Sequence, residues 1–496
     1  MLKNTALGWL ALAFYTMVTN SIVQAQFSAV EPPPKELATG FNSISADQAK
    51  EWLSVLAGPE FEGRGTGQVG YIKAAHYVSG KLAELGLKPV GDGGTFFQML
   101  PMQRRVAEMS ECSITGPKEL NLPGEGNLGF DRFTAAPQTT GEVVFLNFSG
   151  GSMEIPEELV LRDKIVLYLA DEASEASAPR VLALKRPAAA LRIITGEPKS
   201  ISQLVRGAGA NSTSISGTIK TAAARKILTA VGGKSTWMKA ATVAGVTVHP
   251  SGQEVTIAMR IREEPAAVPN VVAWLEGSDP TVNHEFIVIG SHLDHLGVRS
   301  GTVFPGADDN GSGSTAVLSI AKAFAKNPTR PRRSILFIWF AAEEVGLVGS
   351  KHFCDNPLLP LENMTCMFNI DMVGRNEETP NETAAENEGA IHLVGSKKGE
   401  SDIHSLIETA NKHVGFRFEY DQEDVFGRSD QINFYEKGVP VAFLFGGFHP
   451  DYHQPSDLVA AINFDKIAAA ARLYYIAINL AAEHGRFAMK TAEEPK

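Results

Sequence analysis

The chain has 496 residues, which at roughly 150 residues per domain predicts about three domains or two large ones. Its 45 Lys and Arg residues against 56 Asp and Glu residues give a net charge of −11. A basic field that could attract nucleic acid or anionic lipid is therefore not expected, and we predict no nucleic-acid partner. Hydrophobic residues at 44% and charged residues at 20% are ordinary values for a globular enzyme or binding protein.

The N-terminus has the pattern of an export signal. A basic start at Lys3 is followed by a mostly apolar run over residues 6–18 and by small residues up to Ala25. We interpret residues 1–25 as a signal peptide. Because the apolar run is shorter than the ~20 residues that span a bilayer, we expect no stable membrane insertion after its removal, and a periplasmic or extracellular location.

Changes in composition and in the pattern of apolar residues divide the rest of the chain into segments. After the glycine-rich loop at 60–67 and its flanking helices, the sequence changes to short β-like runs separated by Ala, Ser, Thr and Gly, without clustered catalytic residue types. We predict the following segments: 26–130, a leader and the N-terminal part of a catalytic domain; 131–265, an inserted β-rich domain; 266–486, the main catalytic domain; and 487–496, a flexible tail.

The three cysteines are too few for a disulfide framework. Their odd number leaves at least one unpaired within the chain, and a Cys354–Cys366 bridge stays open as an alternative. Cysteine-ligated zinc is not expected, because the sequence contains no CxxC spacing.

Apolar runs alternate with helical patterns from Val271 onward. The runs are continuous rather than alternating, which is typical of strands covered on both faces. We therefore predict an α/β fold with a mixed, mostly parallel sheet between two layers of helices. In such sheets, ligands gather at the carboxyl ends of the strands. The predicted strands are 286–290, 335–340, 367–370 and 439–445, and a helix is predicted over 312–326.

Each predicted strand runs directly into residues that can bind metal or move protons. Taken alone, each has a plainer explanation, such as a helix cap or a surface histidine beside an acid. Taken together, histidines and carboxylates at separate strand ends form the ligand set that suits paired zinc. Two ions that share a carboxylate can activate water for hydrolysis. These residues are His292, Asp294, Asp308-Asp309, Glu343-Glu344, Asp371, His449 and His453.

These blocks resemble the secreted co-catalytic di-zinc aminopeptidases, whose clan includes glutamate-carboxypeptidase-like peptidases. The glycine-rich loop at 61–67, which precedes the insert, also matches, so the insert splits the catalytic domain in two. By its position the insert resembles a protease-associated domain. The matching segments are 61–67, 291–294, 306–313, 341–350, 369–374 and 449–457.

The resemblance implies a role for each matching residue. His292 and Asp371 would bind one zinc, Glu344 and His453 the other, and Asp308 would bridge both, with a cis peptide bond between Asp308 and Asp309. Asp294 would orient His292, and Glu343 would be the general base. The chain departs from the family at Phe426 and Gln431, so the oxyanion donor is left open, with Arg428 and Tyr452 as candidates.

The resemblance implies a metallo-exopeptidase that acts on peptides, most simply an aminopeptidase. A carboxypeptidase or dipeptidase of the same fold would use the same ligands and differ by arginines in its pocket. A glutaminyl cyclase is less expected because it uses one zinc, and a metal-free receptor because the ligand set is complete. A serine hydrolase is disfavoured because the chain has no Gly-x-Ser-x-Gly elbow. The side-chain specificity and the oligomeric state stay open.

Overall fold

A computed structural model describes Phe27, residue 29 and residues 31–132, 138–151, 154–200, 203–205, 214–239, 244–299, 301–398 and 402–487. The predicted signal peptide, 1–25, and almost all of the predicted tail, 487–496, lie outside these residues. A search of the described residues finds no helix with the length and apolar character needed to cross a bilayer.

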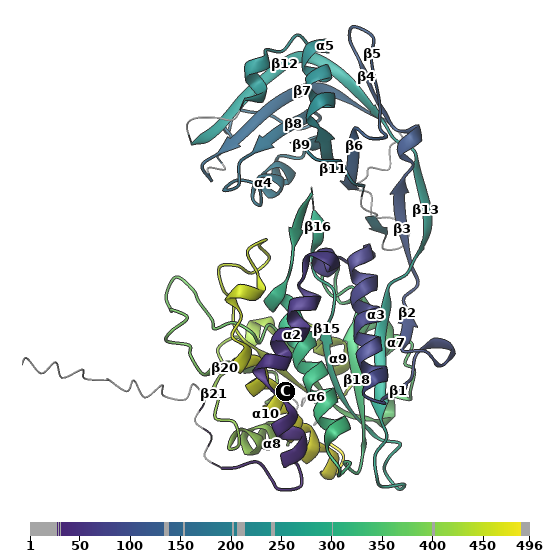
Figure 1. The fold of residues 1–496 in the computed structure, drawn as a ribbon, viewed down its shortest axis with the longest axis vertical. Helices are drawn as coiled ribbons and strands as arrows, with labels where there is room; N and C mark the ends of the chain where they lie inside the picture. The colour runs from purple at the N-terminus through teal and green to yellow at the C-terminus, as the bar shows by residue number, and fades with distance from the viewer. Residues whose placement is uncertain are drawn as a thin grey trace, which may run out of the picture.

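The lower unit in Figure 1 is built on a nine-stranded mixed sheet. Its central strands are parallel to one another, and antiparallel strands flank them on both sides. The α/β fold predicted from the continuous apolar runs is confirmed. Along the sheet the strands are β1 (Lys88–Pro89), β14 (Pro269–Leu275), β18 (Ser334–Phe340), β15 (Phe286–His292), β19 (Met364–Asp371), β22 (Val441–Phe445), β20 (Ala390–Val394) and β21 (Arg417–Glu419), with β2 (Phe97–Met99) paired to β14.

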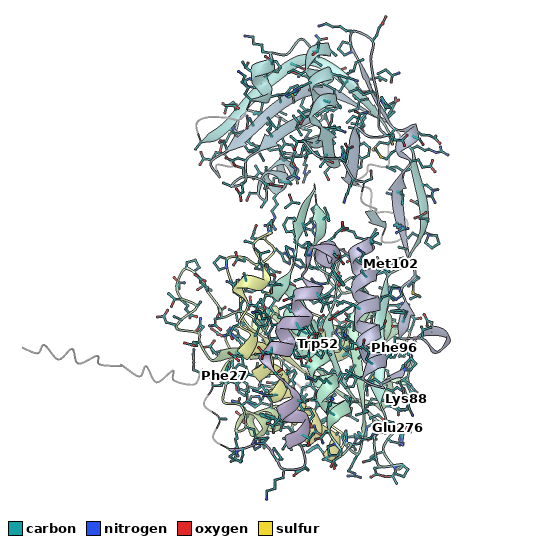
Figure 2. The ribbon with its side chains drawn as sticks, in the orientation of Figure 1. Phe27, Trp52, Lys88, Phe96, Met102 and Glu276 are labelled. Carbon is teal, nitrogen blue, oxygen red and sulfur yellow. The ribbon has the colours of Figure 1, made fainter. Side chains whose placement is uncertain are left out.

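Helices cover both faces of this sheet because alternate strand residues are apolar on both sides. Ile287 and Ile289 of β15 pack under one helical layer, whereas Phe286 and Val288 pack under the other. Trp52, labelled in Figure 2, belongs to the first layer. That layer contains α1 (Ala38–Ser43), α2 (Ala46–Leu56), α3 (Val69–Glu84), α6 (Gly313–Lys326), α8 (Ile403–Asn411) and α10 (Phe464–Glu483), and the opposite layer contains α7 (Val348–Asp355) and α9 (Gln431–Glu436).

The upper unit has its own eight-stranded sheet and its own cores, one on each face. Helix α4 (Ala178–Lys185) packs on one face and α5 (Thr221–Ala230) on the other. In sheet order its strands are β5 (Leu120–Pro123), β4 (Ser113–Gly116), β12 (Gly245–Ala258), β7 (Gln138–Ser149), β8 (Ile165–Ala170), β9 (Ala189–Ile194), β11 (Ile215–Lys220) and β6 (Leu128–Arg132).

Two antiparallel strands join the units. The chain leaves the lower unit through β3 (Met102–Ala107) and returns through β13 (Ile261–Ala266), and these strands pair along their whole length. Met102, labelled in Figure 2, marks the point of departure. Strands β4 to β6 belong to the upper sheet, although the sequence analysis placed residues up to 130 with the catalytic domain. The difference arises because β4 and β6 pair with β12 and β11, far along the chain, whereas β5 pairs with β4.

The three cysteines are buried and unpaired. Cys354 lies in the core on one face of the lower sheet and Cys366 in the core on the other face. The alternative of a Cys354–Cys366 disulfide is therefore wrong in this structure, because the sheet separates the two side chains.

Candidate metal centre

The carboxyl ends of the parallel strands bring the predicted chemical residues together. Strands β15, β18, β19 and β22 run in the same direction, so the segments that follow them meet at one edge of the sheet. A tight turn at Ala307–Ser312, just before α6, reaches the same edge. The side chains that meet there are His292, His295, Asp309, Glu343, Glu344, Asp371 and His453.

One group of possible metal ligands contains His292, Asp309 and Asp371. The Nε2 atom of His292 lies 3.2 Å from Oδ1 of Asp371 and 3.4 Å from Oδ1 of Asp309. All three residues are buried. One ligand atom from each residue lies within 4.8 Å of the other two, a spacing that is compatible with residues that share one ion.

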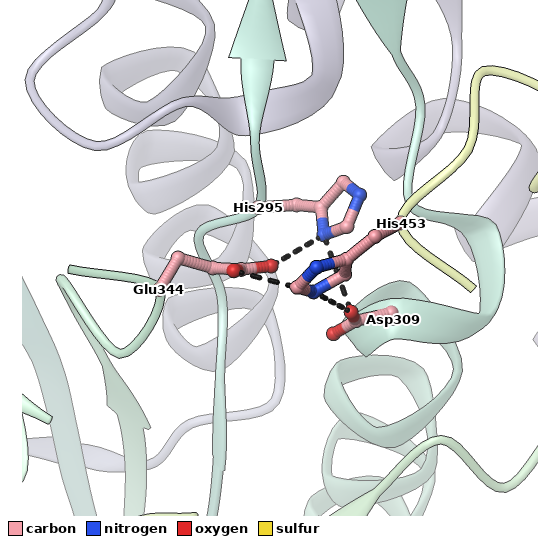
Figure 3. Close-up of side chains that lie close together, drawn as sticks. All are labelled: His295, Asp309, Glu344 and His453. Atoms are coloured by element: carbon pink, nitrogen blue, oxygen red, sulfur yellow. Dashed lines mark ion pairs between the residues drawn. The ribbon is translucent and has the colours of Figure 1, made fainter. Parts of the chain in front are cut away.

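A second group shares Asp309 with the first. His453 Nε2 lies 3.0 Å from Oδ2 of Asp309 and 3.4 Å from Oε2 of Glu344. His295 Nδ1 lies 2.7 Å from Oε1 of Glu344 and 3.6 Å from Oδ2 of Asp309. Figure 3 shows these four side chains facing one another. The sequence analysis did not include His295, although its place three residues after His292 was a visible signal.

The residue common to both groups is Asp309, and the prediction that Asp308 bridges them is wrong. Asp308 points elsewhere: its Oδ1 accepts the Gly374 N–H at 2.6 Å, and its Oδ2 lies 3.2 Å from His449 Nε2. The cis peptide bond follows Asp309 rather than Asp308 and joins it to Asn310. Adjacent aspartates point in different directions in this turn, and the sequence alone did not distinguish them.

The turn that carries Asp309 is held by two buried charged residues. Asp457 accepts the backbone N–H groups of Asp308 and Asp309 at 2.9–3.1 Å. Arg64, from the N-terminal segment, donates to the carbonyls of Pro305 and Gly306 at 2.8 and 2.7 Å, and also to that of Leu293 at 2.9 Å. Charge-assisted hydrogen bonds of this kind are short and strong, so they fix the backbone of the turn.

Asp294 positions the segment after β18 rather than the ring of His292. Its Oδ1 accepts the backbone N–H of Glu343 at 3.1 Å, and its Oδ2 accepts the hydroxyl of Thr66 at 2.5 Å. The Nδ1 atom of His292 lies 2.9 Å from the backbone carbonyl of Asp294. The predicted orientation of His292 is therefore supplied by the main chain of Asp294, whereas its carboxylate orients Glu343.

Hydrogen bonds from neighbouring side chains also fix the orientation of Asp371. The hydroxyl of Ser429 donates to its Oδ2 at 2.8 Å and accepts from the amide of Asn369 at 2.9 Å. The same amide donates to Oε1 of Gln431 at 2.8 Å. Gln431, at which the sequence departs from the family, thus takes part in the network that fixes Asp371. Outer partners of this kind fix the orientation of a metal ligand.

Glu343 and Glu344 differ in their electrostatics although they are neighbours. Burial raises the pKa of Glu343 well above its usual range, and the Coulombic effect of His292 only partly opposes it. Burial also acts to raise the pKa of Glu344, but contacts with His295 and His453 hold it well below its usual range. Glu344 is therefore a stable anion that can serve as a ligand, whereas Glu343 can accept and release a proton.

The two groups fit a pair of zinc ions. Both combine imidazole and carboxylate donors, the set that zinc accepts. Buried polar atoms also lack partners: among the described residues, none gives His295 Nδ1, His295 Nε2 or Glu344 Oε1 a hydrogen bond of good geometry. Buried polar atoms are normally satisfied, so their convergence here indicates a place built for cations.

A third group of possible ligands lies outside this centre. It consists of His392, Glu377 and Glu419. His392 Nε2 lies 3.1 Å from Glu377, which also accepts from the amide of Gln422, and Glu419 is paired with Arg417. Because protein groups already pair with these carboxylates, we assign no metal to this group.

The metal centre opens into a cavity of about 320 Å³. One wall carries the polar residues already described, and the other is apolar. Arg428 lies on this wall, and its guanidinium stacks on the Phe448 ring at 5.1 Å. The upper unit reaches the rim, where Arg180 of α4 donates to the backbone carbonyl of His453 at 2.5 Å. The apolar wall contains Met372, Val425, Phe443, Phe445 and Phe448.

Comparison with known proteins finds a peptidase family that is similar to the part of the chain that carries this centre. Residues 270–477 match the model of peptidase family M28. The chain is similar to leupeptin-inactivating enzyme 1 of Streptomyces exfoliatus, with 34% identity over 179 residues, 36% of this chain and 36% of that protein. It is also similar to the aminopeptidase YwaD of Bacillus subtilis, with 32% identity over 204 residues, 39% of this chain and 40% of that protein. The matches thus span about two fifths of these relatives.

Solved structures resemble the chain over most of its length. An aminopeptidase from Aneurinibacillus sp. strain AM-1 aligns with a TM-score of 0.50 at 19% identity, over 93% of this chain and 99% of that one. A zinc aminopeptidase from Bacillus subtilis aligns with a TM-score of 0.51 at 18% identity, over 88% and 95% of the two chains. At these identities the likeness shows a shared fold.

The shared position of Asp309 predicts unequal effects of two neighbouring substitutions. Asp309→Asn should lose both ions, because it weakens a ligand common to both groups. Asp308→Asn should keep both ions, because its amide oxygen can still accept the Gly374 N–H. Elemental analysis after dialysis against zinc measures the metal content of each variant. The reverse result, with metal lost only in Asp308→Asn, would restore Asp308 as the bridging residue.

Proposed function

Because residues 270–477 match the model of peptidase family M28, we propose that the protein is a zinc aminopeptidase that removes the first residue of peptides with a free N-terminus. The observation that carries the proposal is the pair of ligand groups that share Asp309, with Glu343 beside them. We also propose that it works outside the cytoplasm, on the pattern of residues 1–25.

The proposal includes two zinc ions. His292, Asp309 and Asp371 would hold one, and Asp309, Glu344 and His453 would hold the other. When bound, the ions supply Lewis-acid chemistry, polarising the scissile carbonyl and making a water molecule more acidic. Asp309 is the residue that sets the two sites side by side, since its two oxygens face different groups.

Glu343 is proposed as the general base and then the general acid. Its Oε2 lies 4.0 Å from His292 Nε2, on the cavity wall, and its backbone is fixed by Asp294. The raised pKa suits a group that takes a proton from the attacking water and then gives it to the leaving amine. Its neighbour Glu344 does not suit this role, because its pKa is held low by two histidines.

The charges in the cavity support an aminopeptidase over a carboxypeptidase. Four carboxylates line the cavity, those of Asp309, Glu343, Glu344 and Asp371, and the lining includes one arginine, Arg428. Three of these acids would bind the ions in either class of enzyme, so the argument depends on the cationic side chains, which a substrate carboxylate would need and of which the lining includes one arginine. The relative YwaD, named an aminopeptidase, agrees with this polarity.

The apolar wall of the cavity supports a preference for an apolar first residue. Val425 and Phe445 are buried in a hydrophobic cluster against which Phe448 packs, so their faces are already desolvated. An apolar substrate side chain gains burial there, whereas a lysine or arginine side chain would lose its solvation beside the like charge of Arg428. Leucine- and phenylalanine-like side chains are therefore the proposed substrates at this position.

Product analysis tests the polarity of the reaction. One peptide is offered with a free and with an acetylated N-terminus, with and without a zinc chelator, and its products are identified by mass spectrometry. We expect loss of the first residue from the free form alone, abolished by the chelator. Loss of the last residue from both forms would instead make the protein a carboxypeptidase.

Glu343→Gln separates proton transfer from metal binding. The variant should keep its metal content and fold, but turnover should fall by roughly 10²–10⁴-fold, the usual contribution of a general base. Elemental analysis and peptide hydrolysis on the same preparation measure both. If metal were lost together with activity, Glu343 would be a ligand instead.

Phe448→Ala tests the apolar wall. Removal of the ring should lower kcat/KM for a peptide with leucine in first place by about 10-fold, because part of the side chain's apolar contact is lost. A matched peptide with alanine in first place should change little, since its methyl group reaches the ring less. Equal losses for both peptides would show that Phe448 supports the cavity without setting specificity.

A further inference from the structure

His295 is placed as firmly as the residues that the family implies, yet the family resemblance gives it no role. Its side chain is fully buried, and its backbone N–H donates to the carbonyl of Arg64 at 3.2 Å. Gly306 leaves room for the ring, because a Cβ there would come within 2.4 Å of the imidazole. The ring meets that of His453 edge to face at 5.7 Å. Packing therefore fixes the direction in which the ring points.

We propose that His295 is a direct ligand of the ion held by Asp309, Glu344 and His453, so that this ion has four protein ligands. The inference rests on the proposed zinc function and adds to it a ligand and an order of affinity.

The distances between neighbouring ligand atoms support coordination. His295 Nδ1 lies 2.7 Å from Oε1 of Glu344 and 3.6 Å from Oδ2 of Asp309, and His453 Nε2 lies 3.4 Å from Oε2 of Glu344 and 3.0 Å from the same Asp309 oxygen. A tetrahedron with zinc–ligand bonds of 2.0–2.1 Å has edges of about 3.3 Å. The spacings scatter around this value, and one ligand atom from each of the four residues lies within 4.8 Å of the other three, so the group is compact enough for one ion (Figure 3).

The absence of hydrogen-bond partners around His295 also supports coordination. Nδ1 faces Oε1 of Glu344, yet among the residues described neither atom has a hydrogen-bond partner of good geometry. A residue whose role was only to orient Glu344 would be expected to donate a well-aligned hydrogen bond. A lone pair directed at a shared centre explains both atoms.

The four-ligand arrangement makes the two ions unequal. Sites with four protein ligands are typical of tightly held zinc, whereas catalytic sites keep open positions. The group of His292, Asp309 and Asp371 offers three protein side chains and borders the cavity. We therefore expect the ion at His295 to stay bound when a chelator removes the ion at His292.

The test measures zinc binding rather than activity. Wild type, His295→Ala and His295→Gln are titrated with zinc by calorimetry, and metal content is followed in graded chelator. Glutamine can still donate a hydrogen bond to Glu344 but is a poor zinc ligand. His292→Ala serves as the matched control, because it should weaken the other ion. Circular dichroism of the metal-free proteins checks that the variants fold.

Wild type should bind two zinc ions. In both His295 variants the affinity for the tighter ion should fall by more than 10–100-fold, the loss typical when a residue that only orients a ligand is replaced. X-ray absorption spectroscopy at the zinc edge should show three histidine ligands for each pair of zinc ions in wild type, and two histidine ligands for each pair in His295→Gln. Wild-type affinity or an unchanged histidine count in His295→Gln would overturn the assignment. Fewer than two ions in wild type would instead contradict the two-zinc proposal itself.

Discussion

The centre depends on one carboxylate that faces two ways. Asp309 is buried, and its two oxygens point at different groups of histidines and carboxylates. Collecting several acids in a buried place is costly unless cations compensate them, because each loses its hydration. Imidazoles provide part of that compensation, and two divalent ions would complete it. The position of Asp309 therefore decides whether the surrounding residues form one joint centre or separate, unstable clusters of charge.

Residues distant in the sequence maintain that position. Arg64 and Thr66 precede the upper unit, yet they contact the turn before α6 and Asp294 respectively. Asp457 comes from near the C-terminus and accepts two backbone N–H groups of the same turn. The segment before the upper unit is thus part of the architecture that supports the metal centre.

The α/β sheet and the edge that carries the metal centre could be predicted from the sequence. Continuous apolar strands are typical of a sheet covered on both faces, and the carboxyl ends of parallel strands lie at one edge. His292 and Asp371 end strands, and Glu344 and His453 come after strands, so their convergence was foreseeable. The choice between Asp308 and Asp309 was not, since it depends on how the turn directs two adjacent side chains. The place of β4 to β6 was hidden for a similar reason: β4 and β6 join the upper sheet through β12 and β11, which lie far along the chain, and β5 is attached to it through β4. His295 could have been considered from its spacing, but only the three-dimensional structure brings it to Glu344.

The most direct measurement is a crystal structure of the zinc-loaded protein with anomalous data collected at the zinc edge. We expect two anomalous peaks in the lower unit, each within bonding distance of a different oxygen of Asp309. A single peak, or two peaks that do not share Asp309, would contradict the paired centre on which this account rests.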